Sequence, residues 1–249
     1  SLLDRSGRLA AFLDDAGVRY VRLEKLSDVA GRTGLLLVGP DTLTPAEAFG
    51  RDLVLFAING GRAVVLEQDN PAAGANLPVD MPTSVHYGGY AHPKALGTVV
   101  FRDLGRDDLI DWAGDHPTYK QVYHKPRGGA RALAESGDEL QYAPLVEMGC
   151  GKGVIVVCQL RVGAKLGIDP AADVLCRNLI ETYGAYKPAS GMAAVYAPKR
   201  PILAEYVGDT GVLFESVDDL SSALDPDKYK AVVVDATKEN LAALNAMSK

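Results

Sequence analysis

Hydrophobic and polar positions in the first part of the chain alternate between helical and strand spacing. Residues 4–16 bring Leu9, Phe12 and Leu13 to one face, which predicts a helix. Residues 18–23 alternate between apolar and polar side chains and therefore predict a strand. The chain thus begins with a helix followed by a strand.

Two aliphatic runs follow, at 35–38 and 63–66, and each predicts a strand covered on both faces. A helix is predicted between them, because Thr44 is a good N-cap residue and Pro45 suits the first helical position. We expect its inward side chains to be Phe49, Leu53, Phe56 and Ala57. This order of elements predicts a mostly parallel sheet with helices on its faces.

The middle of the chain carries weaker patterns. Residues 69–94 are rich in Pro, Gly and Asn and predict a long loop. A strand is predicted over 98–102 and a short helix over 107–112. Residues 116–137 are polar and irregular, with some strand potential at 119–124.

A hairpin and a helix form the clearest unit of the sequence. The β-branched runs 142–148 and 154–160 are joined by the glycine-rich segment 149–153, which predicts a tight hairpin turn. Asp169-Pro170 then begins a helix. Its apolar positions recur at helical spacing at Val174, Leu175, Leu179 and Ile180.

The composition changes after Pro188–Gly191, and a second series of alternating strands and helices is predicted to follow. Strands are predicted at 193–196, 212–215 and 231–235, and helices at 201–208, 216–224 and 237–247. We therefore predict a three-layer, doubly wound α/β domain of the flavodoxin or amidotransferase type over 1–187, with an added β-hairpin. Residues 188–249 are either an incomplete second unit or an extension of the same sheet.

Charge and composition exclude several classes of protein. The formal net charge is −6, and the pI near 5.3 argues against nucleic-acid binding, which needs a basic face. No apolar run reaches roughly 18 residues, so no membrane span is expected. Three cysteines are too few for a disulfide scaffold. Because the chain begins at Ser1 without a signal peptide, a fragment or a processed form is expected. The compartment stays open, and a secreted or periplasmic parent protein is the expectation.

The strongest candidates for a functional site lie where buried strands end. Carboxyl ends of parallel strands collect functional groups, and here they carry Asp41 and the run Glu67, Gln68 and Asp69. Related folds place a nucleophile on a strained turn at the second position, where this chain has neither Cys nor Ser. A loop-bracing role is the alternative for these side chains. Trp112 is a further ligand-binding candidate, because tyrosines cluster around it in the middle segment.

Two other sets of reactive side chains favour structural roles. Cys150 and Lys152 lie within the hairpin turn, and Gly-Cys-Gly-Lys-Gly lacks the spacing of a phosphate-binding loop. The four histidines show no close metal-ligand spacing. We therefore assign no catalytic residue, no metal site and no cofactor.

Three segments, GGRAVVLEQD (60–69), APLVEMGCGKGVIVVCQL (143–160) and DPAADVLCRNLIETY (169–183), resemble a known module. They are similar to the class I glutamine amidotransferase-like domain found near the ends of large glycoside hydrolases, especially family 2 and β-galactosidase-type proteins. The resemblance implies an amidotransferase fold that usually lacks the Cys-His-Glu machinery. This chain departs from active amidotransferases in the same way, with Gln68-Asp69 at the elbow and Gln159-Leu160-Arg161 in place of a His-x-Glu pair.

The leading hypothesis is a non-catalytic module of a larger carbohydrate-active protein, serving packing, oligomer contacts or sugar binding. Its expected partners are other domains of the same polypeptide, a carbohydrate, or a second copy of the chain. The alternative is a stand-alone hydrolase that uses carboxylates such as Asp41 and Glu67, which must then face each other across a cleft.

Overall fold

A computed structural model describes residues 1–94, 96–187, 192–209, 212 and 214–247. The chain divides into two compact units, Ser1–Tyr186 and Lys187–Lys249, and each is described by itself. Residues 188–191, at which the predicted composition change falls, lie outside the described residues. The predicted α/β three-layer class is confirmed, because a central sheet in the first unit carries helices on both faces.

The first unit contains a nine-stranded sheet in the order β1-β2-β3-β9-β8-β6-β4, to which β7 and β5 are attached through β8. Four strands pair in parallel with one another: β1 (Leu2–Leu3), β2 (Leu35–Val38), β3 (Arg62–Val65) and β9 (Gly153–Cys158). The others pair antiparallel: β8 (Tyr142–Cys150), β6 (Tyr119–His124), β4 (Thr83–Gly88), β7 (Arg131–Ser136) and β5 (His92–Pro93).

The strand predicted at 18–23 is reduced to one isolated parallel bridge between Leu2 and Arg22. The alternating pattern there reflects a chain lying along β1 and bonded to it through Leu2 alone, with the amide of Leu2 donating to the carbonyl of Val21. This segment nevertheless fixes the topology. The spatial order is residue 22, β1, β2, β3, β9, which is the flavodoxin-like order. In that order, ligand sites are expected at the carboxyl ends of the strands.

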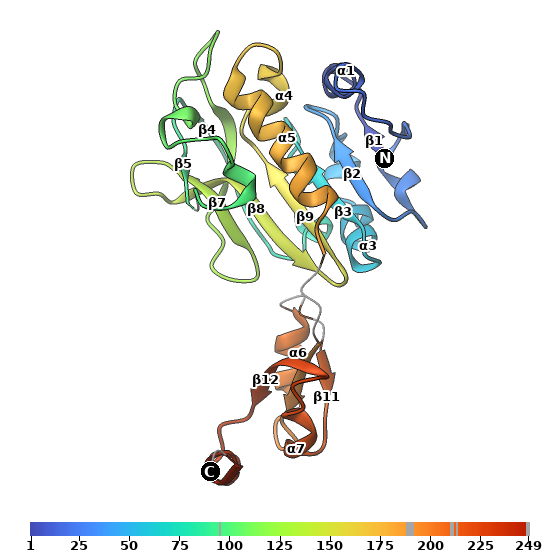
Figure 1. Ribbon diagram of the computed structural model, residues 1–249, viewed down its shortest axis with the longest axis vertical. Coiled ribbons are helices and arrows are strands. Elements are labelled where there is room, and N and C mark those ends of the chain that lie inside the picture. Colours follow the sequence, from blue (N-terminus) through green and yellow to red (C-terminus); the bar gives the residue numbers. More distant parts are fainter. Residues whose placement is uncertain (95, 188–191, 210–211, 213, 248–249) are drawn as a thin grey trace. The chain divides into compact units, whose positions relative to one another are not determined.

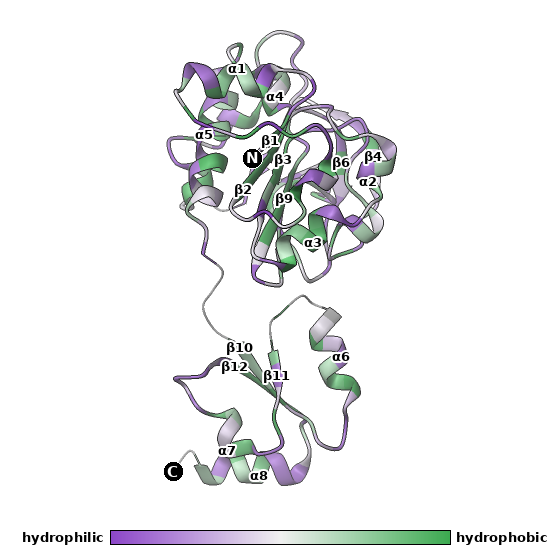
Figure 2. Ribbon diagram, turned by 90° about the vertical axis from the view of Figure 1, so that its right-hand side faces the viewer, coloured by the Kyte–Doolittle hydropathy of each residue, from purple (hydrophilic) through white to green (hydrophobic). Residues whose placement is uncertain are grey.

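Two hydrophobic clusters separate the faces of the parallel strands, because successive side chains point to opposite sides. Leu37, Val64 and Val156 pack with α1 (Arg8–Asp15), α4 (Val162–Lys165) and α5 (Pro170–Gly184). Leu36, Val65 and Val157 pack with α2 (Pro45–Ala48) and α3 (Asp52–Ile58). Figure 1 shows α5 crossing one face of the sheet, and Figure 2 shows the apolar colour of β2, β3 and β9.

The helix predicted from Pro45 is divided into α2 and α3. Thr44 caps α2 as predicted, and it exchanges hydrogen bonds with Glu47 in a capping box. The helix ends at Ala48, and Gly50 lies in the break before α3. Leu53, Phe56 and Ala57 are buried as predicted. The inward prediction for Phe49 is wrong: its side chain is 66% exposed, because the break turns it away from the core.

The middle segment contains more sheet than its composition indicates. The predicted loop at 69–94 holds β4 and β5, and the irregular segment after 116 holds β7 as well as the expected β6. Short 3-10 helices at Val99–Phe101 and Asp107–Leu109 replace the strand predicted at 98–102 and the helix predicted at 107–112. β4 was missed because it is an edge strand with exposed Val85 and Tyr87, so no buried run marks it.

The predicted hairpin and helix are confirmed. β8 and β9 pair from Leu145 with Cys158 to Cys150 with Gly153, which leaves a two-residue turn. Gly151 has a φ of 55° in that turn, a conformation that favours glycine. The Asp169 side chain caps α5 by accepting from the amide of Ala171, and Pro170 is the first helical residue.

The second unit has a parallel sheet of its own in the order β11-β10-β12. Its strands are β10 (Met192–Tyr196), β11 (Phe214–Ser216) and β12 (Tyr229–Val234), and its helices are α6 (Ile202–Asp209), α7 (Leu220–Ala223) and α8 (Lys238–Met247). Residue 213 of the strand predicted at 212–215 lies outside the described residues. No helix in the described part of either unit is long and apolar enough to cross a membrane.

Candidate functional site

A polar pocket of about 100 Å³ lies where β2, β3 and β9 end. It is lined by Asp41, Glu67, Gln68, Asp69, Lys120, Gln121, Gln159, Arg161 and Ala164. Four of the five ligand-binding candidates predicted from the sequence are thus brought together. The parallel strands explain this convergence, because the residues that follow β2 and β3 leave the sheet at the same edge.

Glu67 lies two residues after the last residue of β3 and is buried, with 7% of its surface exposed. Its Oε2 accepts from the amide of Gly163 at 3.0 Å, and its Oε1 accepts from the amide of Ala164 at 2.6 Å. The carboxyl group therefore joins the end of β3 to the first turn of α4. Burial outweighs these hydrogen bonds and raises the pKa of Glu67 to about 7.

Gln68 is a brace between neighbouring strand ends. Its Oε1 accepts from the amides of Thr42 at 2.8 Å and Leu43 at 2.7 Å. Its Nε2 donates to the carbonyls of Gly39 at 2.7 Å and Leu66 at 2.9 Å. All four hydrogen bonds go to backbone atoms, so the side chain amide has no donor left for a ligand.

Gln159, at the end of β9, continues this brace across the sheet. Its Oε1 accepts from the amide of Gln68 at 3.0 Å, and its Nε2 donates to the carbonyl of Gln68 at 3.2 Å. Both glutamines are only 3% exposed. Buried side-chain amides therefore connect the carboxyl ends of β2, β3 and β9. Amides at such buried positions have to be hydrogen-bonded.

Asp41 and Asp69 form the acidic side of the pocket. Asp41 has a φ of 48°, which Asp tolerates better than most residues. Its Oδ1 accepts from the amide of Asp69 at 2.9 Å. Burial, followed by the charge of Asp69, raises the pKa of Asp41 above its usual value. Two strand ends thereby hold two carboxylates side by side.

A cationic group lies at the other side of the pocket and was missed by sequence reasoning. Nη1 of Arg161 donates to both carboxylate oxygens of Asp115 at 2.8 Å. Nζ of Lys165, a side chain only 3% exposed, contacts Oδ1 of Asp115 at 2.5 Å. Hydrogen bonds from Lys165 and Arg161 hold the pKa of Asp115 well below its usual range. The only sequence signal was the position of Arg161 just after a buried strand.

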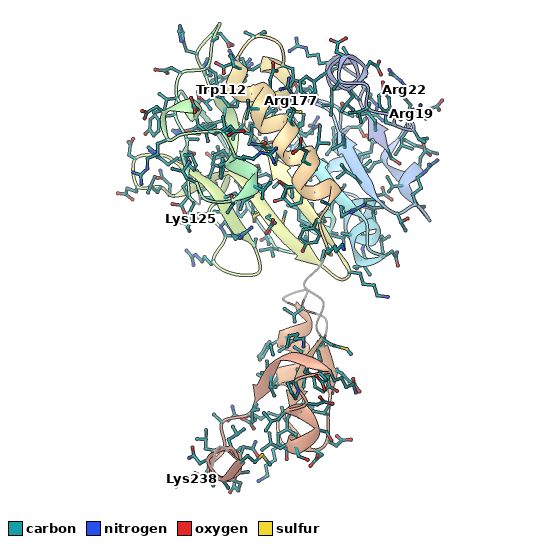
Figure 3. The ribbon with its side chains drawn as sticks, in the orientation of Figure 1. Arg19, Arg22, Trp112, Lys125, Arg177 and Lys238 are labelled. Atoms are coloured by element: carbon teal, nitrogen blue, oxygen red, sulfur yellow. The ribbon has the colours of Figure 1, made fainter. Side chains whose placement is uncertain are left out.

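Trp112, the fifth candidate, lies outside the pocket. Its side chain is 1% exposed within the cluster that contains α5, and Nε1 donates to the carbonyl of Asp108 at 2.7 Å. Figure 3 labels it in the first unit. A ring so deeply buried offers no face to a ligand. Trp112 was singled out because tyrosines surround it in the sequence, and the sequence pattern does not distinguish a core ring from a binding ring.

None of the three cysteines lines the pocket. Cys150, Cys158 and Cys176 are all buried free thiols, and burial raises the pKa of each. A buried thiol with a raised pKa is a poor nucleophile. Among the described residues, no group of three or more His, Cys, Asp or Glu is arranged to hold a metal ion.

Comparison with known proteins yields structural neighbours only. No family model matches the chain, and no curated protein matches it. Cytoplasmic Protein STM1381 from Salmonella typhimurium LT2 is 13% identical, with a TM-score of 0.49, over 71% of this chain and 86% of that one. Cytoplasmic Protein STM3548 from Salmonella typhimurium is 13% identical, with a TM-score of 0.46, over 71% and 85%.

A third neighbour is the exo-beta-1,4-mannosidase Op5Man5 from Opitutaceae bacterium strain TAV5. It is 14% identical, with a TM-score of 0.45, over 73% of this chain and 31% of the mannosidase. These values are too low to transfer any property to this chain.

Proposed function

We propose that this chain is a non-catalytic, amidotransferase-like module of a larger carbohydrate-active protein, whose catalytic part is a glycoside hydrolase. The observation that carries the proposal is the bonding of Gln68. It follows β3 at the position where related folds present a nucleophile, and its amide is consumed by four backbone hydrogen bonds. The resemblance of the segments 60–69, 143–160 and 169–183 to the accessory modules supports the same assignment.

The pocket lining is also consistent with binding or bracing. Its described members are carboxylates, amides, two cations and one alanine, without a hydroxyl, thiol or imidazole. Covalent catalysis would have to use a carboxylate. Both oxygens of Glu67 already accept from backbone amides of the α4 turn, which suits a structural anchor.

One observation favours the alternative, a hydrolase that uses strand-end carboxylates. Glu67 has a pKa raised to about 7, and such a value suits a general acid. Asp41 lines the same pocket. In that case the reaction rate should follow the ionisation of Glu67, and Asp41 should supply the second carboxylate.

Turnover assays separate the two functions. The purified chain is incubated with glutamine, and separately with a panel of p-nitrophenyl glycosides, and ammonia and nitrophenolate are measured. We expect neither product above the buffer blank. Turnover that disappears in Glu67→Gln or Asp41→Asn, but persists in the exposed control Asp15→Asn, would sink the proposal and establish the hydrolase.

A further inference from the structure

We propose that the pocket at the ends of β2, β3 and β9 binds one end of a neutral sugar through two adjacent hydroxyl groups. This inference rests on the proposed function, of which it specifies the ligand. Its basis is the contrast between the floor of the pocket, where hydrogen bonds are complete, and its rim, where donors and acceptors stay open.

The floor consists of Glu67, Gln68 and Gln159, and it needs no ligand. Each carboxylate oxygen of Glu67 and each amide atom of the two glutamines has a backbone partner. Such a floor is rigid and preorganised, and it holds the rim residues in place.

The rim carries unfilled hydrogen-bonding capacity. In the part of the chain that the structure describes, the Asp69 carboxylate and the Lys120 ammonium make neither a hydrogen bond nor an ion pair, and Asp41 uses only Oδ1. Arg161 bonds through Nη1 alone, which leaves Nε and Nη2 for a ligand. The Gln121 amide uses its Nε2 on the carbonyl of Asp69 and keeps its Oε1.

Hydrogen-bond acceptors and donors therefore line the same small pocket. A hydroxyl group both donates and accepts, so a pair of adjacent hydroxyls can donate to Asp69 or Asp41 and accept from Lys120 or Arg161. The pocket has a volume of only about 100 Å³. That space suits two hydroxyls and their carbons, with the remainder of the sugar ring in solvent.

Charge favours a neutral ligand over an ion or a zwitterion. The charge of Arg161 is already paired with Asp115, which Lys165 also contacts. Asp41 and Asp69 line the same pocket as Lys120, whose side chain is exposed. A charged group entering the pocket would thus lose its hydration without meeting a buried, unpaired counter-charge.

Nuclear magnetic resonance titration of the full chain tests the site. The probes are the methyl glycosides of D-mannose, D-galactose and D-glucose, with glycine and acetate as charged probes. We expect a glycoside to bind with millimolar affinity and to shift the amide signals of Asp69, Gly163 and Ala164. Asp69→Asn and Lys120→Met should each weaken binding about fivefold to tenfold, because each removes a charge-assisted hydrogen bond.

Asp15→Asn and Lys152→Met make the same chemical changes at exposed positions outside the pocket and should leave the affinity unchanged. The inference is overturned if no glycoside shifts these amides, if the rim variants bind as tightly as the parent chain, or if glycine or acetate binds more tightly than the sugars. None of these results affects the non-catalytic assignment, which is tested separately by turnover.

Discussion

The amino and carboxyl ends of the parallel strands β3 and β9 differ in how they are packed and hydrogen-bonded. At the amino ends, the backbone approaches closely: a Cβ on Gly153 would lie 1.9 Å from the carbonyl oxygen of Gly61. At the carboxyl ends, Glu67 and Gln159 are buried polar groups with complete hydrogen bonding. The glycine-rich end contains Cys150 and looks reactive in the sequence, yet Gly153 is required there by close backbone packing. The polar pocket lies at the other end.

The largest effect is expected from Gln68→Ala at the carboxyl end. It leaves two amides and two carbonyls without partners in a buried position, so the free energy of unfolding should fall by about 4 kcal/mol or more. Urea unfolding of the variant measures this loss. Lys152→Ala at the exposed hairpin turn is the matched surface change and should stay within about 0.5 kcal/mol. A loss below about 1 kcal/mol for Gln68→Ala would show that the brace contributes little.

Glu67→Gln should alter the pH dependence of stability. Because burial raises the pKa of Glu67 in the folded chain to about 7 from 4.5, the folded state binds the extra proton between these values. The stability contributed by this group is present below pH 4.5 and is lost as the pH rises to 7. The whole change amounts to at most about 3 kcal/mol.

Urea unfolding across this pH range compares the two chains. The parent should lose stability with rising pH relative to Glu67→Gln, whose side chain does not titrate. Parallel stability profiles for the two proteins would mean that Glu67 titrates near its ordinary value. If the parent instead gained stability with rising pH relative to Glu67→Gln, the hydrogen bonds of Glu67 would outweigh its burial.

A smaller effect is expected at the amino end from Gly153→Ala. The added Cβ would meet the carbonyl oxygens of Gly61 at 1.9 Å and Ala57 at 2.6 Å, so we expect a loss of about 2–3 kcal/mol. Gly149→Ala adds the same atom where no heavy atom lies within 4 Å, and it should change the free energy of unfolding by less than about 0.5 kcal/mol. Equal losses for the two variants would contradict the steric account of the hairpin.

The smallest effect is expected from Cys150→Ala, which removes a buried thiol near the hairpin turn. Its Sγ donates a weak hydrogen bond to the carbonyl of Val54 at 3.8 Å and packs in the cluster that contains α3, so the free energy of unfolding should fall by about 1 kcal/mol. Glycoside binding should be unaffected. In the folded parent chain, burial raises the pKa of the Cys150 thiol, and iodoacetamide should modify it far more slowly than in urea. Rapid modification in the folded state would show that Cys150 is a reactive residue.

The sequence predicts those elements whose signals are local. The runs 35–38 and 63–66, the hairpin turn and the Asp169-Pro170 helix start all form as expected, because glycine, proline and β-branched residues act on their own neighbours. β4 was missed because an exposed edge strand lacks a buried run. Phe49 was misplaced because helical periodicity does not reveal a break at Gly50.

The same limit applies to the site. Asp41, Glu67, Gln68 and Asp69 were found because strand-end positions can be recognised from the sequence. Lys120 and Arg161 come from segments far apart in the chain, and their meeting depends on how β6 and β9 are placed in the sheet. The bracing role of Gln68 was also beyond reach, since its four partners are backbone atoms that any sequence provides.

Covalent labelling tests most directly whether the carboxyl end binds rather than reacts. The folded chain is incubated with a diazoketone analogue of glutamine and, separately, with epoxide-bearing glycosides, and its intact mass is then measured. We predict no mass increase at Asp41, Glu67 or Asp69 and none at a cysteine. An adduct on one of these side chains that forms in the folded chain and not in urea would contradict the account, because it would identify an activated nucleophile in the site.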